Sequence, residues 1–373
     1  MRIGVPKEIK NHEYRVGLTP QSVAELTALG HELWVETQAG AAIGFGDADY
    51  RAAGAQIAKD AEQVFSEAQM IVKVKEPLVV ERARLRPEHT LFTYLHLAPD
   101  RPQTEELMAS GATCIAYETV TDGHGRLPLL APMSEVAGRM SIQAGASCLE
   151  KARGSRGVLL GGVPGVAPGK VVILGGGVVG SQALAMAVGL GADVTVLDKS
   201  VDALRRLDAH YGNRITTLYS TRATVREQVL AADLVIGGVL IPGAAAPKLI
   251  SAEMVRQMLP GAVLVDVAID QGGCAETSKA TTHAEPTYVV DDVVHYCVAN
   301  MPGAVARTST LALNNATLPF VIALAEKGVR RALEEDAHLR NGLNVTQGVI
   351  ACASVAEAHG LPHQPAASLI ERL

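Results

Sequence analysis

The sequence predicts an α/β protein with two doubly wound parallel-sheet domains. Strand and helix patterns alternate through the first third of the chain, as in parallel sheets whose strands are joined by helices. A glycine-rich strand–turn–helix begins near residue 170, so almost half of the chain precedes it. A chain of 373 residues is also longer than a domain with a single hydrophobic core usually is. These three observations together favour two domains.

The first region is predicted to begin with a strand at Arg2–Val5. Thr19 is suited to cap the helix that follows. Pro20 would then occupy the first position of this helix, and Gly30 would end the helix. The same patterns predict further strands at 31–36, 70–75, 90–96 and 113–117, with helices near 47–53, 60–67 and 104–110.

Residues 170–198 carry the most specific local pattern. An apolar run leads into Gly175-x-Gly177-x-x-Gly180, and a helix of small residues and a second strand follow. In a dinucleotide-binding turn the first glycine permits the tight turn, the second lets a pyrophosphate approach the backbone, and the third lets helix and strand pack closely. The helix start at Val178 and Val179 would offer N–H groups and the positive end of the helix dipole to the phosphates.

Asp198 ends the second strand, 18 residues after Gly180. A carboxylate at this position accepts hydrogen bonds from the adenosine ribose of NAD and would repel the 2′-phosphate of NADP. Glycine-rich turns with a purely structural role are common, but here strand, turn, helix and acid occur together. The pattern therefore predicts a Rossmann-like domain that binds NAD.

Other patterns extend this second domain and then return the chain to the first. Strands are expected at 215–218, 234–238 and 263–267, with helices at 134–151 and 308–327. We therefore expect a discontinuous substrate-binding domain at 1–128 with 306–373 and an NAD-binding domain at 129–305. An active-site cleft is expected between them.

Composition limits the class of partner. The net charge of −6 offers no basic excess for a nucleic acid. The uncharged stretches 171–192 and 308–325 are long enough to cross a membrane, but the first is the glycine-rich unit and the second contains Asn314, Asn315 and Pro319, so no membrane span is expected. The five cysteines lack metal-binding spacing and the N-terminus lacks a signal sequence, so we expect free thiols, no metal and a cytoplasmic location.

Charged residues at strand ends are the candidates for chemistry, because open parallel sheets bind ligands beyond the carboxyl ends of their strands. Arg15 follows the first strand, and Lys75, His96 and Asp270 end three later ones. An arginine and a lysine together would clamp a substrate carboxylate, and a histidine suits proton exchange near neutral pH. A carboxylate near a nicotinamide could hold an ammonium group or a water molecule.

Simpler interpretations of these residues stay open. Lys73 and Lys75 could be charges on an edge strand. His96 is one of 11 histidines, most of which must be surface or structural. Asp270 could cap a loop, and Asp266 inside the strand competes with it for the catalytic role.

Motifs spread over nearly the whole chain resemble the alanine dehydrogenase family. They are, in order, RIGVPKEIKNHEYRVGLTP, VKVKEP, LFTYLHLA, PMSEVAGRM, GKVVILGGGVVG, VDVAIDQGG and HYCVANMPGAVARTST. The resemblance implies two domains, the first discontinuous, and reversible NAD-dependent oxidative deamination of L-alanine to pyruvate and ammonia. It also implies a homohexamer.

By this resemblance Arg15 and Lys75 hold the substrate carboxylate or carbonyl, His96 is the acid/base, and Asp270 assists the hydrolytic steps. Two positions depart from the family pattern. Ala203 stands where several relatives carry a basic side chain, so no cofactor contact is carried over there, and Lys279 keeps a charge where relatives vary. The resemblance places cofactor contacts at Ser134, Val178, Val179, Asp198, Ser220, Val239, Leu240, Val267, Ala268, Ile269, Asp270, Val298, Ala299, Asn300 and Met301.

Two other functions compete with this one. The soluble NAD(H)-binding alpha subunit of proton-translocating transhydrogenase shares the fold family but needs no amino-acid site. A non-catalytic NAD(H)-binding protein would not need reactive groups at several strand ends. The joint presence of Arg15, Lys75, His96 and Asp270 favours the dehydrogenase.

Overall fold

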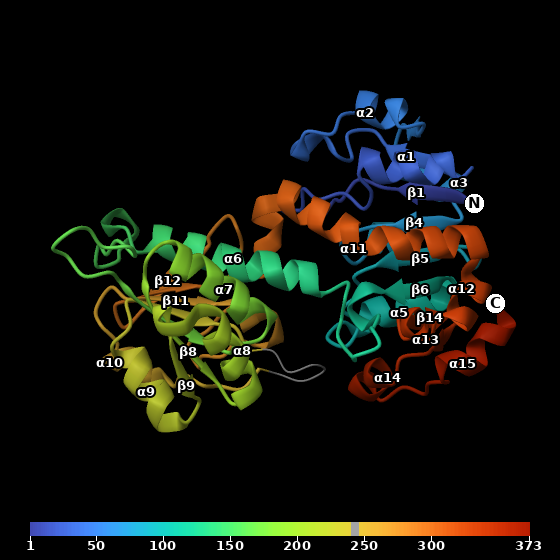
Figure 1. The fold of residues 1–373 in the computed structure, drawn as a ribbon. Coiled ribbons are helices and arrows are strands. Elements are labelled where there is room, and N and C mark those ends of the chain that lie inside the picture. The colour runs from blue at the N-terminus through green and yellow to red at the C-terminus, as the bar shows by residue number, and fades with distance from the viewer. Residues whose placement is uncertain (240–245) are drawn as a thin grey trace. The chain divides into compact units, whose positions relative to one another are not determined.

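The computed structural model describes residues 1–239 and 246–373. These fall into two compact units (Figure 1). Unit 1 contains residues 1–133 and 305–373, and unit 2 contains residues 134–304.

The sheet of unit 1 has the strand order β15-β14-β6-β5-β4-β1-β2-β3. Strands β1 to β6 run parallel, whereas β14 pairs antiparallel with β6 and with β15. The last part of the chain therefore extends the sheet that the first part began. The strands are β1 (Arg2–Val5), β2 (Glu32–Glu36), β3 (Gln56–Ala58), β4 (Met70–Val72), β5 (Thr90–Thr93), β6 (Thr113–Ala116), β14 (Leu343–Thr346) and β15 (Val349–Ile350).

Several helices of unit 1 begin after a residue whose side chain accepts a hydrogen bond from a free N–H group of the first turn. Thr19 accepts a hydrogen bond from Ser22 N at the start of α1, and Asp60 and Asp100 cap α3 and α5 in the same way. The helices are α1 (Pro20–Ala28), α2 (Asp47–Ala52), α3 (Ala61–Glu67), α4 (Val79–Arg82), α5 (Arg101–Ser110), α11 (Ala306–Lys327), α12 (Val329–Glu335), α13 (Ala337–Arg340), α14 (Ala353–His359) and α15 (Ala366–Leu369).

The sheet of unit 2 has the order β12-β13-β11-β10-β7-β8-β9, and all neighbours except β12 and β13 run parallel. Apart from the edge strand β12, this is the strand order of a dinucleotide-binding Rossmann fold. The strands are β7 (Lys170–Leu174), β8 (Asp193–Asp198), β9 (Thr216–Tyr219), β10 (Leu234–Gly237), β11 (Val263–Asp266), β12 (Thr287–Val290) and β13 (Val293–Tyr296). Its helices are α6 (Ala131–Cys148), which begins in unit 1, and α7 (Val178–Gly189), α8 (Val201–Tyr211), α9 (Arg222–Leu230) and α10 (Ala252–Gln257).

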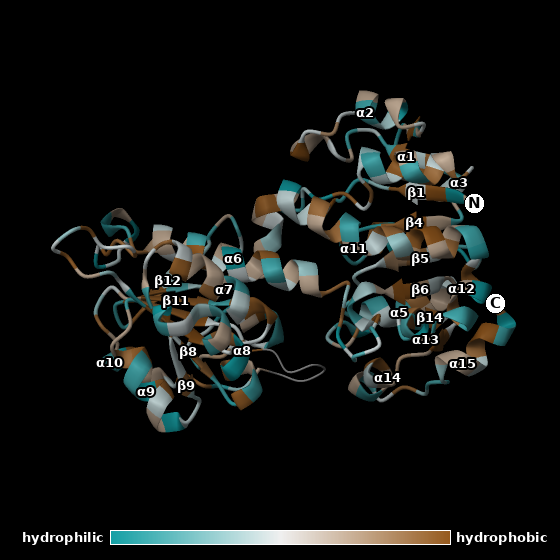
Figure 2. Ribbon diagram, viewed as in Figure 1, coloured by the Kyte–Doolittle hydropathy of each residue, from teal (hydrophilic) through white to brown (hydrophobic). Residues whose placement is uncertain are grey.

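Each unit has its own apolar core, and Figure 2 shows hydrophobic residues along the strands and mixed faces on the covering helices. The stretch 301–327, which includes α11, is long and apolar enough to cross a membrane by composition, and 44% of the 18-residue apolar window within it is buried. Asn314 on α11 accepts from Thr19 N and the Ser22 hydroxyl and donates to Gly17 O. These buried polar contacts are those of a core helix in unit 1.

Two predicted strands end three residues earlier than the sequence suggested. The strands predicted at 70–75 and 90–96 end at Val72 and Thr93. Beyond them, backbone N–H groups at 74–75 and 95–96 donate to glutamate side chains instead of to a neighbouring strand. The short strands β3, β12, β13, β14 and β15 were not predicted.

Candidate active site and dinucleotide site

The glycine-rich turn has the geometry that each of its glycines was predicted to supply. Gly175 has a φ of 101°, and a Cβ there would lie 2.9 Å from Gly238 O. A Cβ on Gly180 would lie 1.7 Å from Gly175 O, so only glycine allows the helix and strand to approach. A Cβ on Gly177, by contrast, would meet no atom within 4 Å among the described residues. The backbone at Gly177 therefore faces open space at the start of α7, where a pyrophosphate would approach.

Asp198 stands at the carboxyl end of β8, beside this turn. Its carboxylate accepts from Gly176 N and from Ser200 N, each at 2.6 Å. These bonds fix the carboxylate against the glycine turn. A carboxylate has about four lone-pair sites, so it keeps acceptors for ribose hydroxyls as well.

The other predicted cofactor residues follow the parallel strands of the same sheet. Ser220 follows β9, Val239 follows β10, residues 267–270 follow β11 and residues 298–301 follow β13. Ser134 lies on α6, and Leu240 lies outside the described residues. Ala203 is buried on α8, where its N–H donates to Ser200, and Lys279 is exposed.

Arg15 is buried in unit 1 and paired with Glu13. Its Nε and Nη2 atoms donate to the two carboxylate oxygens, each at 2.6 Å, while Nη1 lies 3.1 Å from Met133 Sδ. Burial alone would lower the pKa of Arg15, but the hydrogen bonds and charge of Glu13 raise it, so the guanidinium stays charged. The side-on edge of the guanidinium, formed by Nε and Nη2, is thus occupied by Glu13.

Lys75 follows β4, a strand that pairs with β1 on one side and β5 on the other. Neither Lys73 nor Lys75 is therefore an edge-strand charge. Lys73 is fully buried in a cluster with Glu8 and Glu81, 3.1 and 2.6 Å from its Nζ. Glu8 also accepts from Val74 N and Lys75 N, at 2.7 and 3.3 Å. This carboxylate fixes the backbone from which the partly exposed Lys75 side chain extends.

Burial and neighbouring charges act in opposite directions on the pKa values in this region. Burial raises the pKa of Glu8, although the nearby Lys73 ammonium acts in the opposite direction. Burial would lower the pKa of Lys73, but Glu8 and Glu81 raise it, so the ammonium is retained. Beside Lys75, burial would raise the pKa of Glu76, but the charges of Lys75 and Lys10 lower it.

His96 has an unusual backbone conformation for a residue with a side chain. Its φ is 49°, in the left-handed region, which costs on the order of 1–3 kcal/mol unless the surroundings impose it. Leu95 and Leu97 on either side are buried, whereas the His96 side chain is 44% exposed. The left-handed turn at residue 96 therefore exposes the His96 side chain between two buried leucines.

Tyr94 connects His96 with the arginine site. Its ring stacks on the imidazole, with centroids 5.7 Å apart and planes 6° from parallel. The hydroxyl donates to Leu129 O, and burial raises the Tyr94 pKa far above its ordinary value, although the Arg15 charge opposes this. Tyr94 N also donates to Val74 O, next to Lys75. Arg15, Lys75 and His96 are thus gathered at the carboxyl ends of β1, β4 and β5.

In unit 2 the structure distinguishes between Asp266 and Asp270. Asp266 is fully buried, and its carboxylate accepts from Ala268 N at 3.1 Å, Cys274 N at 2.8 Å and the Ser278 hydroxyl at 2.5 Å. It closes the loop after β11, which contains the 3₁₀ turn Val267–Gln271. Asp270 is exposed on that turn. Asp266 is therefore bonded within its own loop, whereas Asp270 is exposed to solvent.

Four residues that contact the candidate side chains were not predicted from the sequence: Glu8, Glu13, Tyr94 and Glu118. Glu8 and Glu13 stand in the first quoted motif, but nothing in it shows which acids face inward. Glu118 comes two residues after β6, so the strand-end criterion that selected Lys75 and His96 also applies to it.

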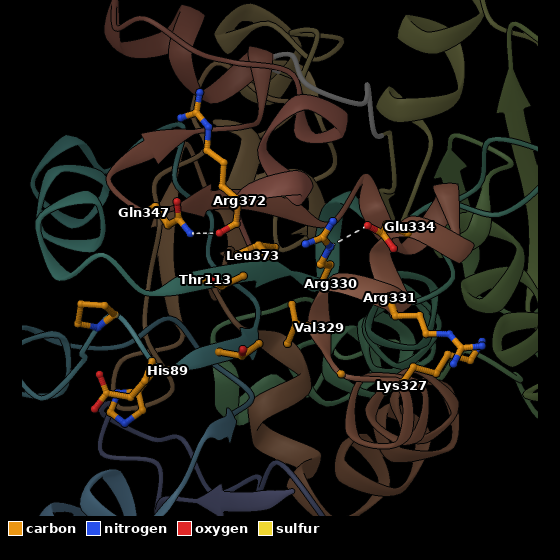
Figure 3. Close-up of a pocket in the computed structure, with 14 residues that line it drawn as sticks. His89, Thr113, Lys327, Val329, Arg330, Arg331, Glu334, Gln347, Arg372 and Leu373 are labelled. Atoms are coloured by element: carbon orange, nitrogen blue, oxygen red, sulfur yellow. Dashed lines mark hydrogen bonds and ion pairs between the residues drawn. The ribbon is translucent and has the colours of Figure 1, made fainter.

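A cavity of about 590 Å³ opens elsewhere in unit 1, beside the amino ends of β5 and β6 (Figure 3). Thr90, Thr113 and Val329 line it, with charged side chains that include Arg330 and Glu334. Arg330 is ion-paired with Glu334, and Gln347 donates to Arg372 O. Since this cavity lies at the amino ends of the strands, it is distinct from the group formed by Arg15, Lys75 and His96.

Two Rossmann-like units, one of them with a dinucleotide turn, define a nucleotide-dependent oxidoreductase. Family models agree: the alanine dehydrogenase/PNT N-terminal domain matches residues 4–137 and the C-terminal domain matches residues 141–353. The chain belongs to the alanine dehydrogenase/PNT family.

Individual relatives are similar over the full length. The chain is 62% identical to an alanine dehydrogenase of Halomonas elongata over 99% of its own length and 100% of that protein. It is 54% identical to the alanine dehydrogenase of Bacillus subtilis, covering 100% of this chain and 98% of that one. A solved L-alanine dehydrogenase matches with a TM-score of 0.94 and 55% identity, over 96% of this chain and 99% of that one. A transhydrogenase from Sinorhizobium meliloti, 24% identical with a TM-score of 0.81 over 95% and 100% of the chains, shares the fold.

Proposed function

We propose that this protein is an NAD-dependent L-alanine dehydrogenase. In one direction L-alanine, NAD⁺ and water would give pyruvate, ammonium, NADH and a proton, and the reaction is reversible. The family and its close relatives support this function. The observation that carries it is the gathering of Arg15, Lys75 and His96 at adjoining strand ends of unit 1, in a chain whose other unit contains a dinucleotide turn.

The residues of unit 2 fit NAD. The open backbone at Gly177, the start of α7 and the Asp198 carboxylate supply a phosphate site and a ribose acceptor in the expected order. A carboxylate at Asp198 favours NAD over NADP. When bound, NAD supplies the acceptor for the hydride that leaves the substrate Cα.

The proposed roles in unit 1 follow from the charges of the side chains and from their positions after the strands. Arg15 would bind the substrate carboxylate, and Lys75 would hold the carboxylate or the carbonyl oxygen that develops at Cα. His96 would remove a proton from the water that adds to the iminium carbon and return it when ammonia leaves. Asp270 would orient this water or the amine.

The proposal includes three further properties. The resemblance supports a homo-oligomer, specifically a hexamer. The five cysteines, all free thiols, support a cytoplasmic location. Small molecules (L-alanine, pyruvate and ammonium), and not a nucleic acid or a membrane, are the expected partners.

One assay separates the candidate functions: NADH oxidation by the purified protein with pyruvate and ammonium. We expect NADH consumption that requires both substrates. A transhydrogenase subunit would need a second nucleotide as hydride acceptor, and a non-catalytic binding protein would bind NADH without consuming it. NADH binding without consumption under these conditions would therefore contradict the dehydrogenase.

A further inference from the structure

We propose that Glu118 is a positioning residue for His96. It holds the peptide groups of residues 95 and 96 in the left-handed turn that presents the imidazole, and it faces Nδ1, so that Nε2 is the ring nitrogen left for substrate. This proposal rests on the proposed function, because it concerns the acid–base step of that reaction.

The contacts of Glu118 converge on the residue before His96 and on His96 itself. Its Oε1 accepts from His96 N at 2.6 Å, and both carboxylate oxygens lie 3.2 Å from Leu95 N. Oε1 also lies 4.0 Å from His96 Nδ1, within ion-pair distance of a protonated ring. Across the described parts of the chain, every hydrogen bond and ion pair of the Glu118 side chain goes to one of these two residues.

Glu118 contacts residues 95 and 96 from the end of the neighbouring strand. It lies in the 3₁₀ turn Tyr117–Thr119 that follows β6, and β6 pairs directly with β5, the strand that leads to His96. Leu95 O accepts from Gln103 Nε2 at 2.6 Å, so the segment is fixed on its carbonyl side as well. Glu118 is the group that satisfies the N–H side, where an extended strand would otherwise continue.

Two groups lie against the ring of His96. Tyr94 stacks on its face, and the Glu118 carboxylate lies beside Nδ1. A carboxylate near one ring nitrogen favours a proton on that nitrogen and orients the other toward the reacting atoms. Removal of Glu118 should therefore act on the proton-transfer step rather than on the binding of either substrate.

Glu118→Ala and Glu118→Gln test this in the full-length protein with pyruvate, ammonium and NADH. Because a displacement of about 1 Å can cost 10²-fold in rate, we expect kcat to fall about 10- to 100-fold in Glu118→Ala. The KM for pyruvate and the Kd for NADH should change less than about threefold. Glu118→Gln, which keeps the shape but places an amide against backbone donors, should lose less than Glu118→Ala.

A double mutant separates positioning from a general structural role. In a His96→Ala background, Glu118→Ala should cost almost nothing further, since the ring that it positions is gone. An equal loss of kcat in both backgrounds would overturn the proposal, as would a Glu118→Ala enzyme with unchanged kcat. Glu105→Gln, which removes an exposed carboxylate paired with Arg101 on α5, is the matched control and should keep full activity. If the unmodified protein fails to oxidise NADH, the proposed function fails; if it succeeds and Glu118→Ala equals it, only the role of Glu118 fails.

Discussion

At the scale of single residues, each candidate for chemistry is held by a buried or half-buried carboxylate. Glu13 pairs with Arg15, Glu8 binds the backbone at Lys75, and Asp266 closes the loop of Asp270. The strand-end criterion selected the candidate side chains from sequence because charge and position are visible there. It could not show Glu8 and Glu13, because whether an acid faces inward depends on packing between segments far apart in the chain.

Replacement of His96 tests the acid–base role directly. General acid–base catalysis contributes roughly 10²- to 10⁴-fold, so His96→Ala should lower turnover by about that range. NADH binding should survive, because the dinucleotide turn lies in unit 2. Turnover can be followed as NADH oxidation and binding as quenching of NADH fluorescence. A His96→Ala enzyme with near-normal turnover would remove His96 from the mechanism.

Replacement by asparagine should lower stability at Asp266 and turnover at Asp270. Asp266→Asn places an amide against buried N–H and O–H donors, so we expect a loss of about 2–3 kcal/mol in the free energy of unfolding. Asp270 is exposed, so Asp270→Asn should alter that free energy by less than about 0.5 kcal/mol and lower turnover at least about tenfold. Urea unfolding and NADH oxidation measure the two quantities. A stable Asp266→Asn protein, or an unstable Asp270→Asn protein, would reverse the assignment.

At the scale of elements, strong local patterns predicted their structures and weak ones did not. The strand β1 has the predicted bounds, and α1 begins at Pro20 with Thr19 as its cap. The strands β12, β14 and β15 were missed because they are short and lie at or near sheet edges. β12 and β15 pair with the neighbouring strands of the chain, whereas β14 also pairs with β6, a strand distant in sequence. Strand ends at 72 and 93 were missed because glutamate side chains, not local preferences, end the ladder there.

Two glycines of the same turn should fail in different ways when each gains a methyl group. Gly177→Ala places its Cβ in open space and keeps an allowed backbone (φ −74°), so the free energy of unfolding should change by less than about 0.5 kcal/mol. The methyl group would occupy the approach of the pyrophosphate, so NADH affinity should fall at least about tenfold. Gly180→Ala would press a methyl group against Gly175 O and cost about 1–3 kcal/mol of stability as well as affinity.

The control lies at the other end of the same helix. A Cβ on Gly189 meets no atom within 4 Å among the described residues, so Gly189→Ala should keep NADH affinity and add about 0.5–1 kcal/mol of stability. Calorimetric titration with NADH and thermal unfolding distinguish the three variants. Full NADH affinity in Gly177→Ala would mean that the pyrophosphate does not approach there.

At the scale of the whole molecule, two sheets of similar design carry different groups at their strand ends. In unit 2 these ends carry glycines, backbone N–H groups and acids, whereas in unit 1 they carry basic side chains, a histidine and the acid that contacts it. The alternation of strands and helices predicted both sheets, and the mid-chain glycine turn indicated which of them takes the dinucleotide. Sequence could not show which of the 11 histidines are buried, and buried histidines determine how the stability of the protein depends on pH.

Acidification should destabilise the protein through histidines that have no proposed catalytic role. Burial lowers the pKa of His89 in unit 1 and of His295 in unit 2 below the ordinary 6.5. As the pH falls past about 6.5, the unfolded chain takes up protons at these residues while the folded chain remains neutral until the lower, folded-state pKa is reached. The unfolded state then binds more protons, so the free energy of unfolding falls with pH, by up to about 1.4 kcal/mol per pH unit for each such histidine.

Replacement of His295 measures the contribution of one buried histidine to the pH dependence of stability. Its Nδ1 lies 2.9 Å from Val293 O and its Nε2 lies 2.8 Å from the Thr277 hydroxyl, which suits a neutral ring that donates at one nitrogen and accepts at the other. His295→Gln cannot take up a proton, so the difference in urea midpoint between about pH 7.5 and about pH 5.5 should be smaller than in the unmodified protein. His210→Gln, at an exposed position on α8, should leave that difference unchanged. The same pH dependence in His295→Gln as in the unmodified protein would show that protonation of this buried ring does not drive the loss of stability.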